Sequence, residues 1–356
     1  MKFKKKSKNA PLLSSVYMLQ KAFLFVVLIL AIGVTCGLGQ GVTSNDTIKI
    51  DTRLVSVPVI VSDRDGRYVP NLTAADFTVF QDGLPQKIEF FAATEEPLTI
   101  ALLIDTSQST RAVLDDIKDS ARSFIKLLRV QDRAMIVSFD SDTHVLSQLT
   151  SDHEQLNRAV KNADIPFDFG TTLRDAAYQT INRSFGGIKG RKAIILLTDG
   201  KDVGSRISSR ELLHALQESD TLIYTIMFTP EPRMGRGQFP LPSGGRRNGG
   251  IFGGRFPRGP GDGRRNDRIE RKNEEAEVFL RELSYTTAGR FYSSKDGKLK
   301  QTFANILDEL RFQYRLGFYP PEETVEKDLH ELKAKVSRPE AVVRARTGYR
   351  VQNKQN

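Results

Sequence analysis

The chain has 356 residues, of which 39% are hydrophobic and 27% are charged, an ordinary composition for a globular protein with a sizeable core. This length allows two domains. The formal net charge is +10, but much of the excess lies in the first 21 residues and in a Gly/Arg-rich stretch near residue 250. Overall basicity is therefore weak support for nucleic-acid binding, and we do not expect nucleic acid as a partner.

Residues 1–44 are expected to be a targeting segment. The positively charged start "MKFKKKSKN" precedes an apolar run at 22–36, "AFLFVVLILAIGVTC", which has the length of a signal peptide. We therefore expect an exported, extracytoplasmic protein whose N-terminal segment is either cleaved or kept as a single-pass membrane anchor. The single cysteine, Cys36, lies in this segment, so the remainder has to fold without a disulfide.

The two flanks of the chain have the pattern of β-strands. Apolar and polar residues alternate over 48–63, where Pro58 indicates an edge strand, and Asp-Gly pairs in "DRDGRYV" and "FQDGLPQ" predict hairpin turns. The alternation returns in "FQYRLGFYP", "LHELKAKVS" and "AVVRARTGY". Each flank is too small to be stable alone. We therefore expect 45–96 and 312–356 to pair into one β-sandwich.

Residues 97–311 alternate between strand-like and helix-like segments. "LTIALLID" is a continuous apolar run, as expected for a strand buried on both faces, and "TRAVLDDIKDSARSFIKLLR" follows with apolar residues at helical spacing. The strands "AMIVSFD", "KAIILLTD", "TLIYTIMF" and "RFY" come later, separated by helical segments. This order predicts an α/β domain with a doubly wound, mostly parallel sheet, inserted in the sandwich. The Gly/Arg/Pro-rich stretch 229–272 has no periodicity and is predicted to be a disordered insertion.

Acidic and hydroxyl side chains follow the predicted strands where these end. They occur in "IDTSQS", in "FGTTLRDA" before a helix, and in "LLTDGKD", and comprise Asp105, Ser107, Ser109, Thr171, Thr172 and Asp199. Ligands gather at the carboxyl ends of strands in open α/β sheets, so we expect these groups to converge. Carboxylates and hydroxyls are hard donors suited to Mg²⁺, Mn²⁺ or Ca²⁺. Mg²⁺ prefers octahedral coordination and keeps open or water-filled positions when the protein supplies few ligands, which favours an additional carboxylate from a partner.

The order of these motifs resembles the von Willebrand factor A (VWA) domain, whose metal-ion-dependent adhesion site (MIDAS) uses Asp-x-Ser-x-Ser, then Thr, then Asp. The resemblance covers residues 97–295. Family members commonly have Gly-Gly-Thr where this chain has Phe169-Gly170-Thr171, with Thr172 as a weaker alternative. The resemblance implies a bound divalent cation, Mg²⁺ first and Mn²⁺ or Ca²⁺ as alternatives. The implied ligands are Asp105, Ser107, Ser109, Thr171 and Asp199.

The flanks resemble the VWFA-related proteins of acidobacteria, which are exported. Neighbouring acids have simpler expected roles: Asp175 in the first turn of a helix, and Asp140 and Asp142 in a loop. The four histidines are isolated in sequence, and no zinc spacing, G-x-S-x-G or P-loop motif is present. The sequence therefore indicates a binding protein and not an enzyme.

Two functions remain open at this point. In the first, the A-like domain holds a cation that captures an acidic side chain on a protein partner. In the second, the chain is an extracytoplasmic scaffold whose basic insertion 229–272 binds anionic polymer or membrane, and the metal is structural.

Overall fold

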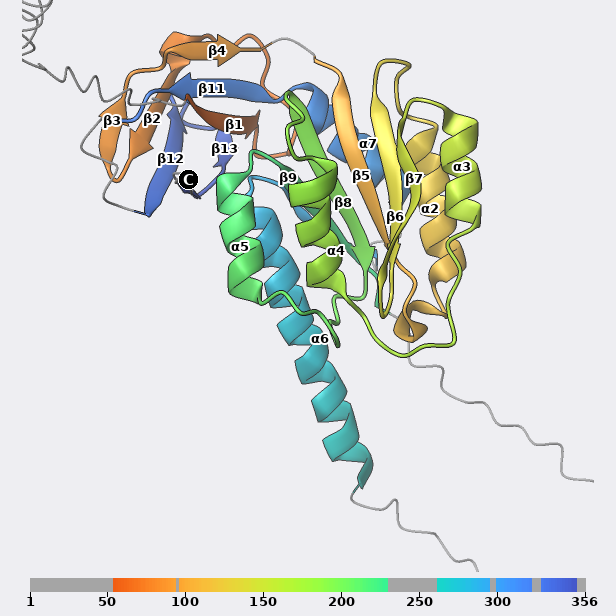
Figure 1. The fold of residues 1–356 in the computed structure, drawn as a ribbon. Coiled ribbons are helices and arrows are strands. Elements are labelled where there is room, and N and C mark those ends of the chain that lie inside the picture. Colours follow the sequence, from red (N-terminus) through yellow and green to blue (C-terminus); the bar gives the residue numbers. More distant parts are fainter. Residues whose placement is uncertain (1–53, 94–95, 230–260, 295–298, 322–327, 351–356) are drawn as a thin grey trace, which may run out of the picture. The chain divides into compact units, whose positions relative to one another are not determined.

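The computed structural model describes residues 54–93, 96–229, 261–294, 299–321 and 328–350 (Figure 1). Residues Thr52–Asn356 form one compact unit. The predicted targeting segment 1–44 lies outside the described residues, as do residues 230–260 of the predicted insertion. Within the described ranges, no helix is both long enough and apolar enough to span a bilayer.

A six-stranded sheet forms the centre of the α/β domain, in the order β10-β9-β8-β5-β6-β7. Every neighbouring pair is parallel except β6 with the edge strand β7. This confirms the predicted mostly parallel sheet. The strands are β5 (Leu98–Asp105), β6 (Arg133–Phe139), β7 (Thr143–Thr150), β8 (Arg191–Thr198), β9 (Leu222–Met227) and β10 (Phe291–Ser293).

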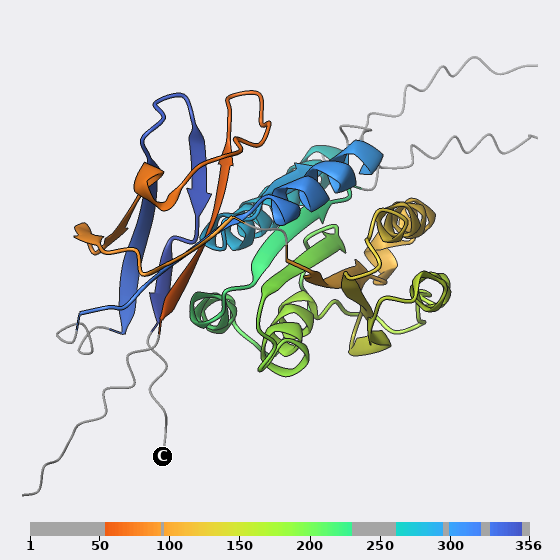
Figure 2. The same ribbon diagram turned by 90° about the horizontal axis from the view of Figure 1, so that it is seen from above.

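Helices cover both faces of this sheet, as Figure 2 shows. The side chains of β5 explain why: Ile100 and Leu102 point into one apolar cluster, and Ala101 and Leu103 into another. The first cluster is completed by α2 (Leu114–Ile125), α3 (His153–Lys161) and α7 (Leu299–Arg311). The second is completed by α4 (Leu173–Gln179), α5 (Ser209–Glu218) and α6 (Gly261–Thr286). The doubly wound arrangement is therefore confirmed.

Both flanks contribute strands to a β-sandwich of two four-stranded sheets, in the orders β13-β1-β11-β4 and β14-β12-β2-β3. Val57, Val79 and Phe318 are among the residues of its shared core. The predicted sandwich is therefore confirmed. From the first flank come β1 (Val55–Ser62), β2 (Phe77–Gln81), β3 (Leu84–Gln86) and β4 (Phe90–Ala92). From the second come β11 (Tyr314–Phe318), β12 (Leu329–Val336), β13 (Val342–Ala345) and β14 (Gly348–Arg350).

The turn and edge predictions for the sandwich had different outcomes. Asp82 and Gly83 join β2 to β3 with φ values of 50° and 85°, as a type I′ hairpin turn requires, so that prediction is confirmed. The edge-strand prediction from Pro58 is wrong, because β1 lies between β13 and β11. Since β13 pairs only with residues 59–62, Pro58, which has no N–H to donate, lies beyond that ladder.

Two further differences concern the α/β domain. The sequence pattern predicts no element between β6 and α4, where the structure has β7 and the short helix α3, capped by Asp152. The predicted disorder of 229–272 is wrong for 261–272, which belong to α6. Arg, Lys and Glu favour helix, and α6 is anchored further along by the buried Leu280 and Leu283. Residues 267–272 are therefore polar because they form a solvent-exposed part of a helix, and not because they are disordered.

Candidate metal site

Four of the five predicted ligands follow the neighbouring strands β5 and β8: Asp105, Ser107, Ser109 and Asp199. The chain leaves β5 through α2 on one face and leaves β8 through α5 on the opposite face. The carboxyl ends of these two strands are thus the topological switch point, the usual ligand position in a doubly wound sheet. Asp105 is the last residue of β5, and Asp199 directly follows β8.

Two buried carboxylates form the base of the site. Asp105 and Asp199 have exposed fractions of only 0% and 1%. Asp105 Oδ1 accepts the Ser107 backbone N–H at 2.9 Å, and Oδ2 accepts the Thr198 hydroxyl at 2.6 Å. Burial first, and the charge of Asp199 second, raise the pKa of Asp105 to about 7, against the opposite effect of the Ser107 and Thr198 hydrogen bonds. Two charged carboxylates buried together are costly unless positive charge compensates them.

The serine hydroxyls are brought together by a tight turn after β5. The 3₁₀ turn Gln108–Thr110 places Ser107 Oγ and Ser109 Oγ 2.9 Å apart. Thr110 fixes the turn, because its hydroxyl donates to the carbonyl oxygens of Asp105 and Ser107, both at 2.9 Å. Thr110 was not among the predicted site residues. Its position five residues after Asp105 is the only signal that the sequence offers for this role.

The structure distinguishes the two candidate threonines. The Thr172 hydroxyl donates to the carbonyl of Asp140 at 3.0 Å, and its N–H donates to the same oxygen at 2.7 Å. The Thr172 hydroxyl is therefore already used in a hydrogen bond within the protein, which favours Thr171 as the candidate ligand. Thr171 is buried and pairs through its backbone with Val203, on the loop after Asp199. Asp140, expected to be a simple loop residue, is buried and also accepts the Thr106 hydroxyl at 3.0 Å.

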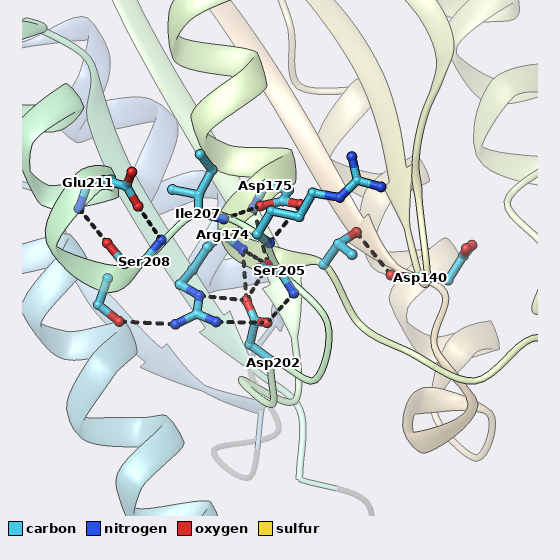
Figure 3. A network of polar contacts seen from close by, with 11 residues as sticks. Asp140, Arg174, Asp175, Asp202, Ser205, Ile207, Ser208 and Glu211 are labelled. Carbon is cyan, nitrogen blue, oxygen red and sulfur yellow. Dashed lines mark hydrogen bonds and ion pairs between the residues drawn. The ribbon is translucent and has the colours of Figure 1, made fainter.

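A second polar network ties the loop after Asp199 to the start of α4 (Figure 3). The Asp202 carboxylate accepts the Arg174 backbone N–H at 2.9 Å, the Arg174 guanidinium at 3.1 Å and the Ser205 hydroxyl at 2.7 Å. Asp175 lies in the first helical turn, as expected, and accepts the backbone N–H of Ile207 at 2.9 Å. Arg174, Asp202 and Ser205 were missed from sequence, since no local spacing links Arg174 to the other two.

Lys201 was also missed from sequence. Its ammonium lies 2.6 Å from Asp199 Oδ2, and its backbone N–H donates to Asp199 Oδ1 at 3.1 Å. Within the described part of the chain, no group of three or more His, Cys, Asp and Glu side chains is arranged to hold a metal. The candidate site instead combines two carboxylates with neutral hydroxyls, a donor set that fits a hard divalent cation.

Comparisons with known proteins identify the class of the α/β domain. Residues 100–201 match the family model of the von Willebrand factor type A domain. This range includes all five proposed ligands, the whole of β8 and most of β5. The chain therefore contains a von Willebrand factor type A domain. No curated protein matches the chain. The resemblance of the flanks to acidobacterial proteins stays a prediction, because the matched range does not include them.

Several solved structures are similar to the chain. BatB from Bacteroides thetaiotaomicron is 18% identical, over 60% of this chain and 98% of BatB, with a TM-score of 0.41. An aerotolerance-related membrane protein from Bacteroides fragilis is 17% identical, over 60% of this chain and 98% of that one, with a TM-score of 0.43. Proximal thread matrix protein 1 from the mussel byssus, with a zinc-occupied MIDAS motif, is 14% identical, over 64% of this chain and 48% of its own, with a TM-score of 0.43.

Proposed function

We propose that this chain is an exported, non-enzymatic binding protein whose VWA domain captures an acidic side chain of a protein partner through a divalent cation. The residues that would hold the cation are Asp105, Ser107, Ser109, Thr171 and Asp199. The observation that carries the proposal is the buried pair Asp105 and Asp199 at the switch point, with the Ser107 and Ser109 hydroxyls beside it. Two buried carboxylates without sufficient positive charge would only destabilise the fold.

Mg²⁺ takes six oxygen ligands, so five side chains would leave one position that a partner carboxylate could fill. Mg²⁺ is the first candidate, and Mn²⁺ and Ca²⁺ are alternatives. Zn²⁺ belongs among the ions to test, because the similar mussel protein holds zinc at its MIDAS motif. The chain's own residues prepare the site: Thr198 and Ser107 orient Asp105, and Asp202 holds the loop that carries Asp199.

The sandwich is proposed to be the platform that carries the VWA domain. Two arginines support this role. Arg346, which is buried, donates to the carbonyls of Gln217 and Ser219 at the end of α5, at 3.1 and 3.3 Å. Arg344 of β13 forms an ion pair with Glu309 of α7 at 2.7 Å. These contacts would keep the binding domain fixed on its platform. The predicted N-terminal segment would export the chain and, if retained, associate it with a membrane.

Calorimetric titration of Mg²⁺, Mn²⁺, Ca²⁺ and Zn²⁺ into the full chain, with and without millimolar acidic peptide, tests the proposal. We expect saturable binding that Asp105→Ala abolishes and that the peptide strengthens. Absence of binding under both conditions would overturn the proposal. Partner capture that survives EDTA but is lost in high salt, or on deletion of 230–260, which leaves α6 intact, would instead support the scaffold alternative.

A further inference from the structure

The loop that leads into Thr171 exposes large apolar side chains. Phe167 and Phe169 are 96% and 87% exposed, the largest values for any phenylalanine that the structure describes. Val203, which pairs with Thr171 through its backbone, is 70% exposed. We call Phe167, Phe169 and Val203 the apolar rim. Burying phenylalanine side chains stabilises a fold, so two phenylalanines left in water at a candidate site indicate a binding surface.

The loop is anchored on both sides of the two phenylalanines. On one side, Gln108 Nε2 donates to the Pro166 carbonyl at 2.5 Å, and Gln108 itself lies between the two site serines. On the other side, Gly170 lies so close to Ser141 that a Cβ at this position would be 3.1 Å from its Cα. The loop is thus fixed at its ends while its aromatic side chains face solvent, the combination that lets an aromatic residue bind at a low cost in conformational entropy.

The charges beside the apolar rim favour an acidic partner. The Arg111 guanidinium donates to Gln108 Oε1 at 2.8 Å. Lys201, whose side chain is 31% exposed, forms an ion pair with Asp199. Asp168, between the two phenylalanines, is an exposed acid that works against this preference. The proposed cation would add further positive charge at the centre of the same surface. Apolar groups around a positively charged centre match a segment with bulky apolar residues next to an acid.

We propose, building on the proposed function above, that the apolar rim selects the partner: the site binds a protein segment in which an Asp or Glu is flanked within a few residues by large aliphatic or aromatic side chains. The partner's carboxylate binds the ion at its open position, and the apolar side chains beside this acid cover Phe167, Phe169 and Val203. Buried aromatic anchors carry much of the binding energy in protein interfaces, so the rim determines which acidic segments bind.

The test uses the full chain and a displayed library of nonapeptides with Asp or Glu fixed at the centre, selected in Mg²⁺. We expect enrichment of Leu, Ile, Phe or Trp near the fixed acid, and at least about tenfold weaker binding of the selected peptides to the double variant Phe167→Ser/Phe169→Ser. Tyr285→Ser is the matched control, because this aromatic side chain is 74% exposed on α6, outside the site. Equal melting temperatures and equal Mn²⁺ titrations would show that the double variant is folded and keeps its ion site.

Failure of this inference and failure of the proposed function give different results. Peptides that need Mg²⁺ and Asp105 but bind the double variant as well as the wild type would overturn the role of the rim alone. Peptides that bind in EDTA and to Asp105→Asn would overturn the proposed function. If no peptide is enriched, or if vesicles of phosphatidylcholine and phosphatidylserine bind through the two phenylalanines instead, a protein partner at the rim is excluded.

Discussion

Thr198 donates its hydroxyl hydrogen to Asp105 across the β5–β8 boundary, with 2.6 Å between Oγ1 and Oδ2, and both side chains are fully buried. Thr198 Oγ1 also accepts the backbone N–H of Gly200 at 2.9 Å. A single hydroxyl thus connects one proposed ligand to the loop that carries the other. The strength of this connection can be measured.

Thr198→Val removes the hydroxyl and preserves the shape of the side chain. We expect the free energy of unfolding to fall by about 2 kcal/mol, because a hydrogen bond to a buried charged group is lost, and we expect weaker cation binding. Urea denaturation and calorimetry measure the two effects. Thr225→Val is the control, since this equally buried threonine on β9 bonds only to neutral groups, Leu280 O and Ser284 Oγ. A similar loss of cation affinity in both variants would contradict the specific role of Thr198.

Asp105→Asn is expected to stabilise the protein in EDTA and to abolish its stabilisation by Mg²⁺. The amide removes the repulsion between Asp105 and Asp199, which are both buried. We expect a melting temperature in EDTA about 2–4 °C above that of the wild type, equivalent to roughly 1 kcal/mol for a domain of this size. Differential scanning calorimetry with and without Mg²⁺ measures both effects. Asp168→Asn, at an exposed acid, should change neither value; a lower melting temperature for Asp105→Asn in EDTA would refute the prediction.

Lys201→Met is expected to strengthen cation binding. The Lys201 ammonium lies 2.6 Å from Asp199 Oδ2 and therefore competes with a divalent ion for this carboxylate. Removing the competitor should lower the dissociation constant for Mn²⁺ by roughly tenfold, equivalent to about 1.4 kcal/mol, as measured by calorimetry. Lys192→Met is the matched control, because Lys192 forms a comparable 2.7 Å ion pair with Asp220 at the N-terminal end of β8, the end opposite to Asp199. Unchanged or weaker binding by Lys201→Met would show that Lys201 does not compete.

The start of α5 should make a pH-dependent contribution to stability. The Ser208 backbone N–H donates to Glu211 Oε2 at 2.7 Å and is the main cause of the lowered pKa of Glu211. Because the pKa is lower in the folded state, the stabilisation is present above the ordinary pKa of a glutamate and is lost as pH falls through the folded value. Glu211→Gln should therefore melt below the wild type at about pH 7, and the two should converge near pH 3.

Circular dichroism melts at several pH values measure this difference. Glu218→Gln provides a control of opposite sign, because Glu218 lies at the C-terminal end of α5, where a negative charge is unfavourable. Parallel pH profiles for wild type and Glu211→Gln would contradict the prediction.

Sequence patterns were sufficient for the elements with strong local signals. The apolar run ending in Asp105, the Asp-Gly turn at Asp82 and the alternation of both flanks depend on residues close together in the chain, so they predicted the α/β class, the hairpin and the sandwich. Short or highly charged elements were missed, namely β7, α3 and the first part of α6. Their length or polarity gives little periodicity. Packing against the sheet core stabilises β7 and α3, and the exposed first part of α6 continues a helix that is anchored at Leu280 and Leu283.

For the site, the sequence by itself determined the donor types and their order: Asp105 with two serines, then Thr171, then Asp199. Only the tertiary structure decided their environment. Asp105 and Thr198 meet 93 residues apart because β5 and β8 become neighbours, and Lys201 and Asp202 acquire their roles only once the loops fold around the switch point. Burial, charge compensation and the exposure of Phe167 and Phe169 depend on this non-local packing, which no spacing of residues along one strand or helix can encode.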